Sequence, residues 1–136
     1  MLRLMTAATG EPVSLDEAKA HLRVIDSDED ALIRAYITAA REVVERQTGY
    51  ALAQATYAWS GEDVEEIPIL PAQRTSREGE RPFVFVTQPG PIPAPLRAAI
   101  LLLVGDLYAN REAAMERTVE NPAFSRLISP YQRMSL

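Results

Sequence analysis

The side chains with the clearest metal-binding spacing in this 136-residue chain are Asp26, Asp28 and Asp30, which alternate as at the start of a calcium-binding loop. Such a loop needs glycine at its sixth position and a bidentate acid at its twelfth. Ala31 and Ile37 stand at those two positions. The pattern therefore predicts an acidic helix start and no metal site.

The remaining candidates for catalysis are isolated from one another. His21 is the only histidine, with no second histidine to share a metal and no serine or cysteine nucleophile motif beside it. Glu65 and Glu66 are adjacent carboxylates, but acid–base catalysis needs a pocket that shifts their pKa values. The chain has no cysteine and no glycine-rich phosphate loop. We therefore predict no catalytic residue, no metal, no cofactor and no enzymatic activity.

The charge of the chain disfavours a protein that coats DNA. Nineteen acids against 14 bases give a net charge of −5, and Lys19 is the only lysine. A duplex binder needs Lys and Arg to displace counterions from phosphates. Trp59 and the tyrosines could stack on bases, but they are not interleaved with basic residues. A small helical nucleic-acid-binding regulator stays as the alternative function, and it would need a basic recognition helix.

Length and composition indicate one domain made in the cytoplasm. A chain of 136 residues with 47% hydrophobic and 24% charged residues is ordinary for a globular protein. The N-terminus is too short and too weakly apolar for a signal peptide. The longest apolar run, residues 98–105, falls far below the ~20 residues that span a bilayer.

Helices are expected over about residues 15–22, 29–48 and 95–112. Ser14 can cap the first helix, and Glu17 three residues later completes a capping box. In the second helix, apolar residues recur at helical spacing on one side, and Gly49 is the natural stop. The other side of that helix is expected to be polar and to carry these residues: Arg34, Arg41, Glu42, Glu45 and Arg46.

Short strands are expected over about residues 55–60, 65–70 and 83–87. Pro68 and Pro71 confine the second strand to a sheet edge or a bulge. The fold class that follows is α+β and mainly α: a small helical bundle with a short antiparallel strand insertion and an extended C-terminal tail. We expect a single domain over residues 1–120 and a tail over residues 121–136.

The third helix is apolar on two sides. One face carries Leu96, Ile100, Leu103, Val104 and Leu107. Ala98, Leu102 and Gly105 lie on roughly the opposite side, and a helix that is apolar on two sides is buried on two sides. Two covers for this second side stay open, a neighbouring subunit or the small sheet.

The C-terminal tail carries large side chains behind the helix-breaking pair Asn121 and Pro122. Exposed in water, these apolar residues would be an aggregation liability. The tail is therefore expected to dock on a partner, or alternatively to pack on its own domain. Its candidate docking residues are Phe124, Leu127, Ile128, Pro130, Tyr131 and Arg133.

Four segments in this order resemble the head–tail connector (adaptor) family of tailed bacteriophages, prophages and gene transfer agents. Residues 12–23 are similar to the family's opening helix, and residues 28–49 to its long second helix. Residues 96–112 are similar to its central helix, which closes on a Tyr-x-Asn-Arg-Glu pattern. Residues 127–132 are similar to its terminal Leu-Leu-x-Pro-Tyr-Arg-type tail, with Gln132 in place of the basic residue.

The resemblance implies a homo-oligomeric ring, typically a dodecamer, below the portal protein at the capsid vertex. The ring would continue the channel through which DNA passes without sequence-specific binding. Its C-terminal segment would dock on the portal, and its far side would receive a downstream neck or tail protein. The protein is then expected in a virion or phage-like particle, with Ala98, Leu102 and Gly105 at the subunit interface.

Overall fold

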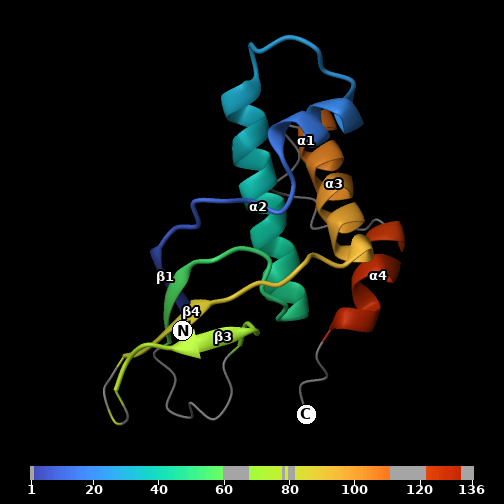
Figure 1. Cartoon of the computed structure of the whole chain (residues 1–136). Helices are drawn as coiled ribbons and strands as arrows, with labels where there is room; N and C mark the ends of the chain where they lie inside the picture. Colours follow the sequence, from blue (N-terminus) through green and yellow to red (C-terminus); the bar gives the residue numbers. More distant parts are fainter. Residues whose placement is uncertain (1, 60–67, 78, 80–81, 111–121, 133–136) are drawn as a thin grey trace.

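The computed structural model describes residues 2–59, 68–77, 79, 82–110 and 122–132 (Figure 1). Four helices and a four-stranded antiparallel sheet confirm the expected α+β, mainly α fold class. In chain order the elements are β1 (Leu2–Thr6), α1 (Leu15–Leu22), α2 (Asp30–Thr48), β2 (Thr56–Trp59), β3 (Ala72–Arg74), β4 (Phe83–Thr87), α3 (Ala94–Ala109), α4 (Pro122–Ile128) and the 3₁₀ turn η1 (Ser129–Tyr131).

The three expected helices are present as α1, α2 and α3, although α3 ends at Ala109 and residues 111–112 of its expected range lie outside the described part. The Ser14 hydroxyl accepts a hydrogen bond from the Glu17 backbone N–H at 3.1 Å, as its capping role predicts. The Glu17 carboxylate does not complete a capping box but binds Arg97 of α3 at 2.8 and 2.9 Å. Gly49 ends α2 with φ of 69° and donates to the Glu45 carbonyl at 2.7 Å.

The helices form one layer with a core of its own. α2 and α3 lie side by side and run in opposite directions, with α1 and α4 packed against them (Figure 1). The fully buried side chains include Ile33 and Val44 from α2, Ile100 and Val104 from α3, and Phe124 from α4. These contacts fix the position of α3 relative to α2, and so decide which of its faces stays outside.

The sheet forms a second, smaller core. Its strand order is β1-β2-β4-β3, and Tyr57 of β2 pairs with Phe85 of β4. β4 alternates buried and half-buried residues, which is the pattern of a strand with one face on a core. The expected strands over 55–60 and 83–87 are confirmed, and β1 is a strand that the sequence did not predict.

The strand expected over residues 65–70 is wrong for residues 68–70. Residues 65–67 lie outside the described part of the chain. Leu70 forms only an isolated bridge with Tyr50, and the third strand is β3, two residues later. Pro68 and Pro71 have no N–H to donate, so a regular ladder begins only beyond them.

The C-terminal segment is helical rather than extended. α4 begins at Pro122, whose fixed φ suits the first helical position. Phe124 and Ile128, four residues apart, then face the helical core together. The short helix escaped prediction because only this one pair carries its periodicity.

Candidate functional site

The inner face of α3 holds the helical layer together. Leu96, Ala99, Ile100 and Val104 have no exposed surface, and Leu103 is 4% exposed. They pack against α2, as spacing of three and four residues on one helix face requires. This half of the prediction for α3 is confirmed, except that Leu107 is only half-buried.

The outer face of α3 is only half covered. Ala98, Leu102 and Gly105 are each half-buried, and Ala109 beyond them is exposed. The sheet does not cover this face within the described residues, because the sheet side chains form a separate cluster. The sheet is therefore excluded as the cover of this face, and a neighbouring subunit is the predicted cover that stays open.

Helix α1 covers one edge of this outer face. A Cβ placed on Gly105 would meet the His21 ring nitrogen Nε2 at 3.6 Å. Arg97, about two turns earlier in α3, is bound to Glu17 of α1. His21 is thus a packing residue beside Gly105, and the open part of the face narrows to Ala98, Leu102 and Ala109.

The candidate docking residues of the tail divide into two groups. Phe124 and Ile128 are each 2% exposed and belong to the helical core of their own chain. For these two, packing on the own domain, the second of the two expectations, is what the structure shows. They are therefore not free to dock on a partner.

The other tail residues lie nearer the surface. Leu127 and Tyr131 are half-buried and Pro130 is exposed. The Tyr131 ring meets the Tyr50 ring edge-on, with centroids 6.0 Å apart and an interplanar angle of 86°. Arg133 lies outside the described residues. The surface available for docking is thus centred on Pro130.

A buried charge network that the sequence did not predict joins α2 to the two chain segments beside it. Arg41 of α2 binds the Glu11 carboxylate at 2.9 and 3.1 Å and the Glu45 carboxylate at 2.5 Å. Glu45 also accepts from the Leu52 N–H at 3.1 Å, and Thr38 donates to Glu11 at 3.0 Å. The network therefore holds the linkers before α1 and after α2 against the same helix.

Arg41 and Glu45 were expected on the polar side of α2, and that expectation is wrong. Their exposed fractions are 2% and 1%. The signal in the sequence was the spacing of four in Ile33, Ile37, Arg41 and Glu45, which continues the buried stripe through two charged residues. Paired charges can replace apolar residues on a buried face when their hydrogen bonds are satisfied.

The pKa shifts show the competing forces in this network. Burial raises the pKa of Glu45 above its ordinary value, against the opposing effect of its hydrogen bond to Arg41. Burial alone would lower the pKa of Arg41, but its bonds to Glu11 and Glu45 raise it. Arg41 therefore stays charged, and the network is structural because its donors and acceptors are engaged with one another.

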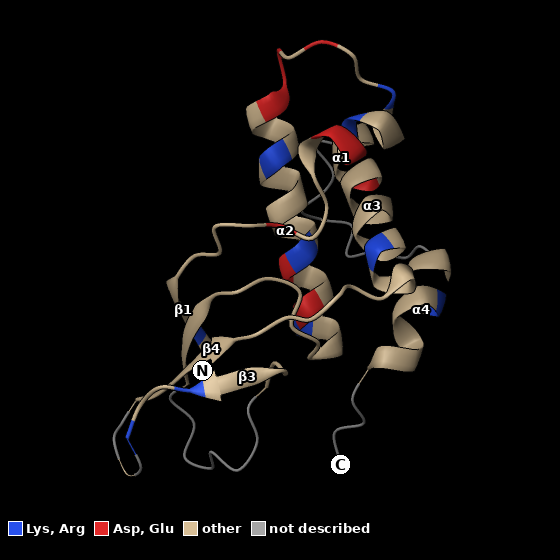
Figure 2. Cartoon of the chain, viewed as in Figure 1, with Lys and Arg blue, Asp and Glu red and all other residues tan. Residues whose placement is uncertain are grey.

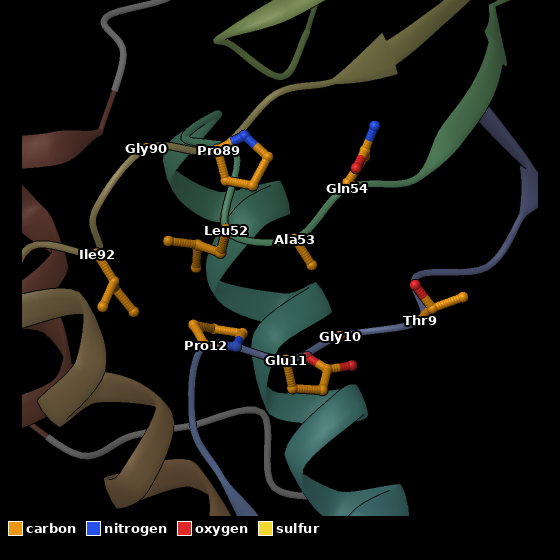
Figure 3. Close-up of a pocket in the computed structure, with 10 residues that line it drawn as sticks. All are labelled: Thr9, Gly10, Glu11, Pro12, Leu52, Ala53, Gln54, Pro89, Gly90 and Ile92. Atoms are coloured by element: carbon orange, nitrogen blue, oxygen red, sulfur yellow. The ribbon is translucent and has the colours of Figure 1, made fainter.

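A pocket of about 340 Å³ opens beside this network (Figure 3). Three linkers line it, around Glu11, Leu52 and Pro89. The Glu11 carboxylate, its one ionisable group, is already bound by Arg41 and Thr38. The one carboxylate of the pocket is thus engaged in the charge network.

The described part of the chain lacks two further kinds of feature. No group of three or more His, Cys, Asp or Glu side chains in that part is placed to hold a metal ion. No helix there combines the length and apolar character needed to cross a membrane. The candidate surfaces predicted from the sequence are the outer face of α3 and the Pro130 surface, which is the exposed Pro130 with the half-buried Leu127 and Tyr131.

The family model of the phage gp6-like head–tail connector proteins matches residues 12–132. The chain belongs to this family. The match spans all the helices and thus confirms the resemblance found in the sequence. Curated protein sequences yield no significant match to the chain.

Two solved structures have a similar fold. One is a chain of the virion of a native gene transfer agent particle, with a TM-score of 0.69 and 19% identity. The other belongs to the neck of an empty gene transfer agent particle computed with C6 symmetry, with a TM-score of 0.72 and 20% identity. Each likeness covers 100% of this chain and 97% of the other. At these identities the comparison establishes the fold that this connector shares with them.

Proposed function

We propose that this connector is a structural ring protein in the neck of a virion or phage-like particle. It joins the portal at the capsid vertex to the next neck or tail protein and continues the DNA channel. The observation that carries this proposal is the family match over residues 12–132. The two structural neighbours come from gene transfer agent particles, one of them from a neck, which supports the same location.

The outer face of α3 supports a ring. A ring consists of heterologous contacts that close by rotation, so each subunit needs a different surface on each side. Ala98 and Leu102 give one such surface, with Gly105 at its edge beside His21. A dodecamer, which the family resemblance implies, is compatible with the sixfold symmetry of the similar neck structure.

The Pro130 surface is the proposed portal contact, with Leu127 and Tyr131 in it. Arg133, which follows outside the described residues, is proposed as part of the same contact. Phe124 and Ile128 fix the position of this surface, because they anchor α4 in the helical core. Repetition of this contact around a ring adds avidity, so a weak single contact becomes a durable attachment.

DNA in this proposal passes through the channel without being read. The Lys and Arg residues of the described chain are distributed over both the helical layer and the sheet region, and the α1–α2 loop is acidic (Figure 2). A basic recognition helix, which the alternative of a nucleic-acid-binding regulator requires, is not among α1 to α4. We propose no enzymatic activity and no cofactor for the connector.

The test is the mass of the native full-length protein, measured with and without purified portal rings. A closed ring that sediments with portal is the expected result. Pro130→Asp should keep the ring and lose the portal, whereas Ser125→Asp, an exposed position on α4, should keep both. A protein that stays monomeric in the presence of portal would contradict the proposal.

A further inference from the structure

A second apolar helix face has no partner among the residues that the structure describes, and it lies on the side of the helical layer opposite the outer face of α3. Ala35, Ala39 and Val43 recur every four residues along α2, and all three are exposed. Val43 is one of the five large apolar side chains that the described structure leaves exposed. The inner side of the same helix carries Ile33, Ile37 and Val44, so this outer face points away from α3.

We propose that the outer face of α2 packs on the outer face of α3 of a second copy of this chain, and that this is the repeating contact of the ring. This inference rests on the proposed ring function. It names the second surface of the contact between subunits, which the proposed function left unassigned. The α3 side consists of Ala98 and Leu102, and the α2 side of Ala35 and Ala39. The two faces differ, as a heterologous contact requires, and each is presented on its own side of the subunit.

The outer faces of α2 and α3 lie at the same height along the helix axes. α2 and α3 are antiparallel, and Tyr108 donates to Glu29 at 2.9 Å, which places these two residues at the same end of the layer (Figure 1). Ala35 lies six residues after Glu29, and Leu102 lies six residues before Tyr108. Since each helix rises 1.5 Å per residue, Ala35 and Leu102 lie at nearly the same height.

The same count places Ala39 level with Ala98, ten residues from the Glu29–Tyr108 contact on each helix. The proposed contact places the ring axis along the helices, and rotation about such an axis leaves every height unchanged. A neighbouring subunit therefore brings Ala35 to Leu102 and Ala39 to Ala98 without any shift along the axis. Small residues on both helices also allow the backbones to approach to the short end of the usual 8–10 Å spacing.

Electrostatics also favours this alignment of α2 with α3 of the next copy, at the end of the contact where α3 begins. The first turn of α3 contains no acidic residue, and its N-cap, Pro93, makes no side-chain capping bond. Glu42 flanks the outer face of α2 and lies level with Pro95 by the same count. A carboxylate beside a helix N-terminus is stabilising, so Glu42 of one copy suits the start of α3 in the next, where Ala94 is exposed.

Cysteine cross-linking of the full-length protein tests this contact on a background without native cysteine. Disulfides need Cα atoms about 4.4–6.8 Å apart, which closely packed helices provide at facing small residues. Ala39→Cys combined with Ala98→Cys should yield a ladder of covalent multimers up to the full ring under mild oxidation. Each single variant should yield no ladder, because its cysteine would face an alanine.

A matched pair tests the register. Ala39→Cys with Ala109→Cys places both cysteines on the same two faces but eleven residues apart in height on α3, about 16 Å. This pair should not cross-link beyond the background of the single variants. A ladder from this pair, or covalent dimers from Ala39→Cys alone, would overturn the inference.

The measurement also separates this inference from the function on which it rests. Native mass of the unoxidised double variant, with and without portal, reports the ring directly. A ring without the Ala39–Ala98 ladder overturns the α2–α3 contact and leaves the connector function standing. Absence of a ring in the wild-type protein, with portal present, overturns both.

Discussion

The two faces of α3 differ in both size and burial. The inner face presents Ile100 and Val104, which are fully buried, whereas the outer face presents Ala98 and Leu102, which are half-buried. Both faces are apolar, so composition alone does not distinguish them. The difference shows that the inner side of the helix serves folding, while the proposed function assigns its outer side to assembly.

The inner face should dominate the stability of the monomer. Ile100→Ala removes a fully buried side chain and leaves a cavity between α3 and α2, with an expected loss of about 2–5 kcal/mol in unfolding free energy. Leu102→Ala, the matched change on the outer face, should cost less than about 1.5 kcal/mol, because its site is already half open. Urea denaturation of both variants measures the two losses, and equal losses would erase the distinction between the faces.

The buried charge network offers a second contrast with the outer faces, because it joins segments rather than subunits. Arg41→Met leaves the carboxylates of Glu11 and Glu45 without their cation, and breaking a buried pair costs about 3 kcal/mol. Arg46→Met, an exposed position on the same helix, should change stability by less than about 0.5 kcal/mol. Thermal unfolding of the two variants checks this, and similar midpoints would exclude a structural role for the network.

The parts of this fold that the sequence predicted are those with repeated, self-consistent signals. α2 has a long apolar stripe and a glycine stop, and β4 is an unbroken run of aromatic and β-branched residues, so both appear where expected. The positions of α1 and α4 relative to α3 depend on contacts between distant segments, such as Glu17 with Arg97. No local pattern encodes such a pairing, so the cover of Gly105 by His21 could not be predicted.

The candidate surfaces could likewise be predicted only where local helix geometry determines them. The two-sided character of α3 was visible in the sequence, because it depends only on helix geometry. Which tail residues stay free was not visible, because the burial of Phe124 and Ile128 depends on a helix of two turns that one residue pair specifies. Arg41 was misplaced because a charged residue is expected outside unless its partners, Glu11 and Glu45, are known.

A gentler change to the network separates charge from hydrogen bonding. Glu45→Gln keeps an oxygen that can accept from Arg41 or from the Leu52 N–H, and Arg41 retains Glu11. Burial already disfavours the charge of Glu45, as the raised pKa shows, so its removal offsets part of the lost attraction. The expected net loss is about 1 kcal/mol, measured by urea denaturation. A loss as large as that of Arg41→Met would mean that the carboxylate charge itself is indispensable.

The smallest effect on folding should accompany the largest effect on assembly. Ala35→Trp adds bulk on the exposed outer face of α2, so the unfolding free energy should stay within about 0.5 kcal/mol of wild type. The same bulk would hold the next subunit's α3 away, and native mass should shift from rings to monomers. Ala7→Trp, at an exposed position outside the helices, is the control and should leave the ring intact. Intact rings from Ala35→Trp would show that the outer face of α2 is free in the assembly, and the comparison between folding and assembly faces would then hold for α3 alone.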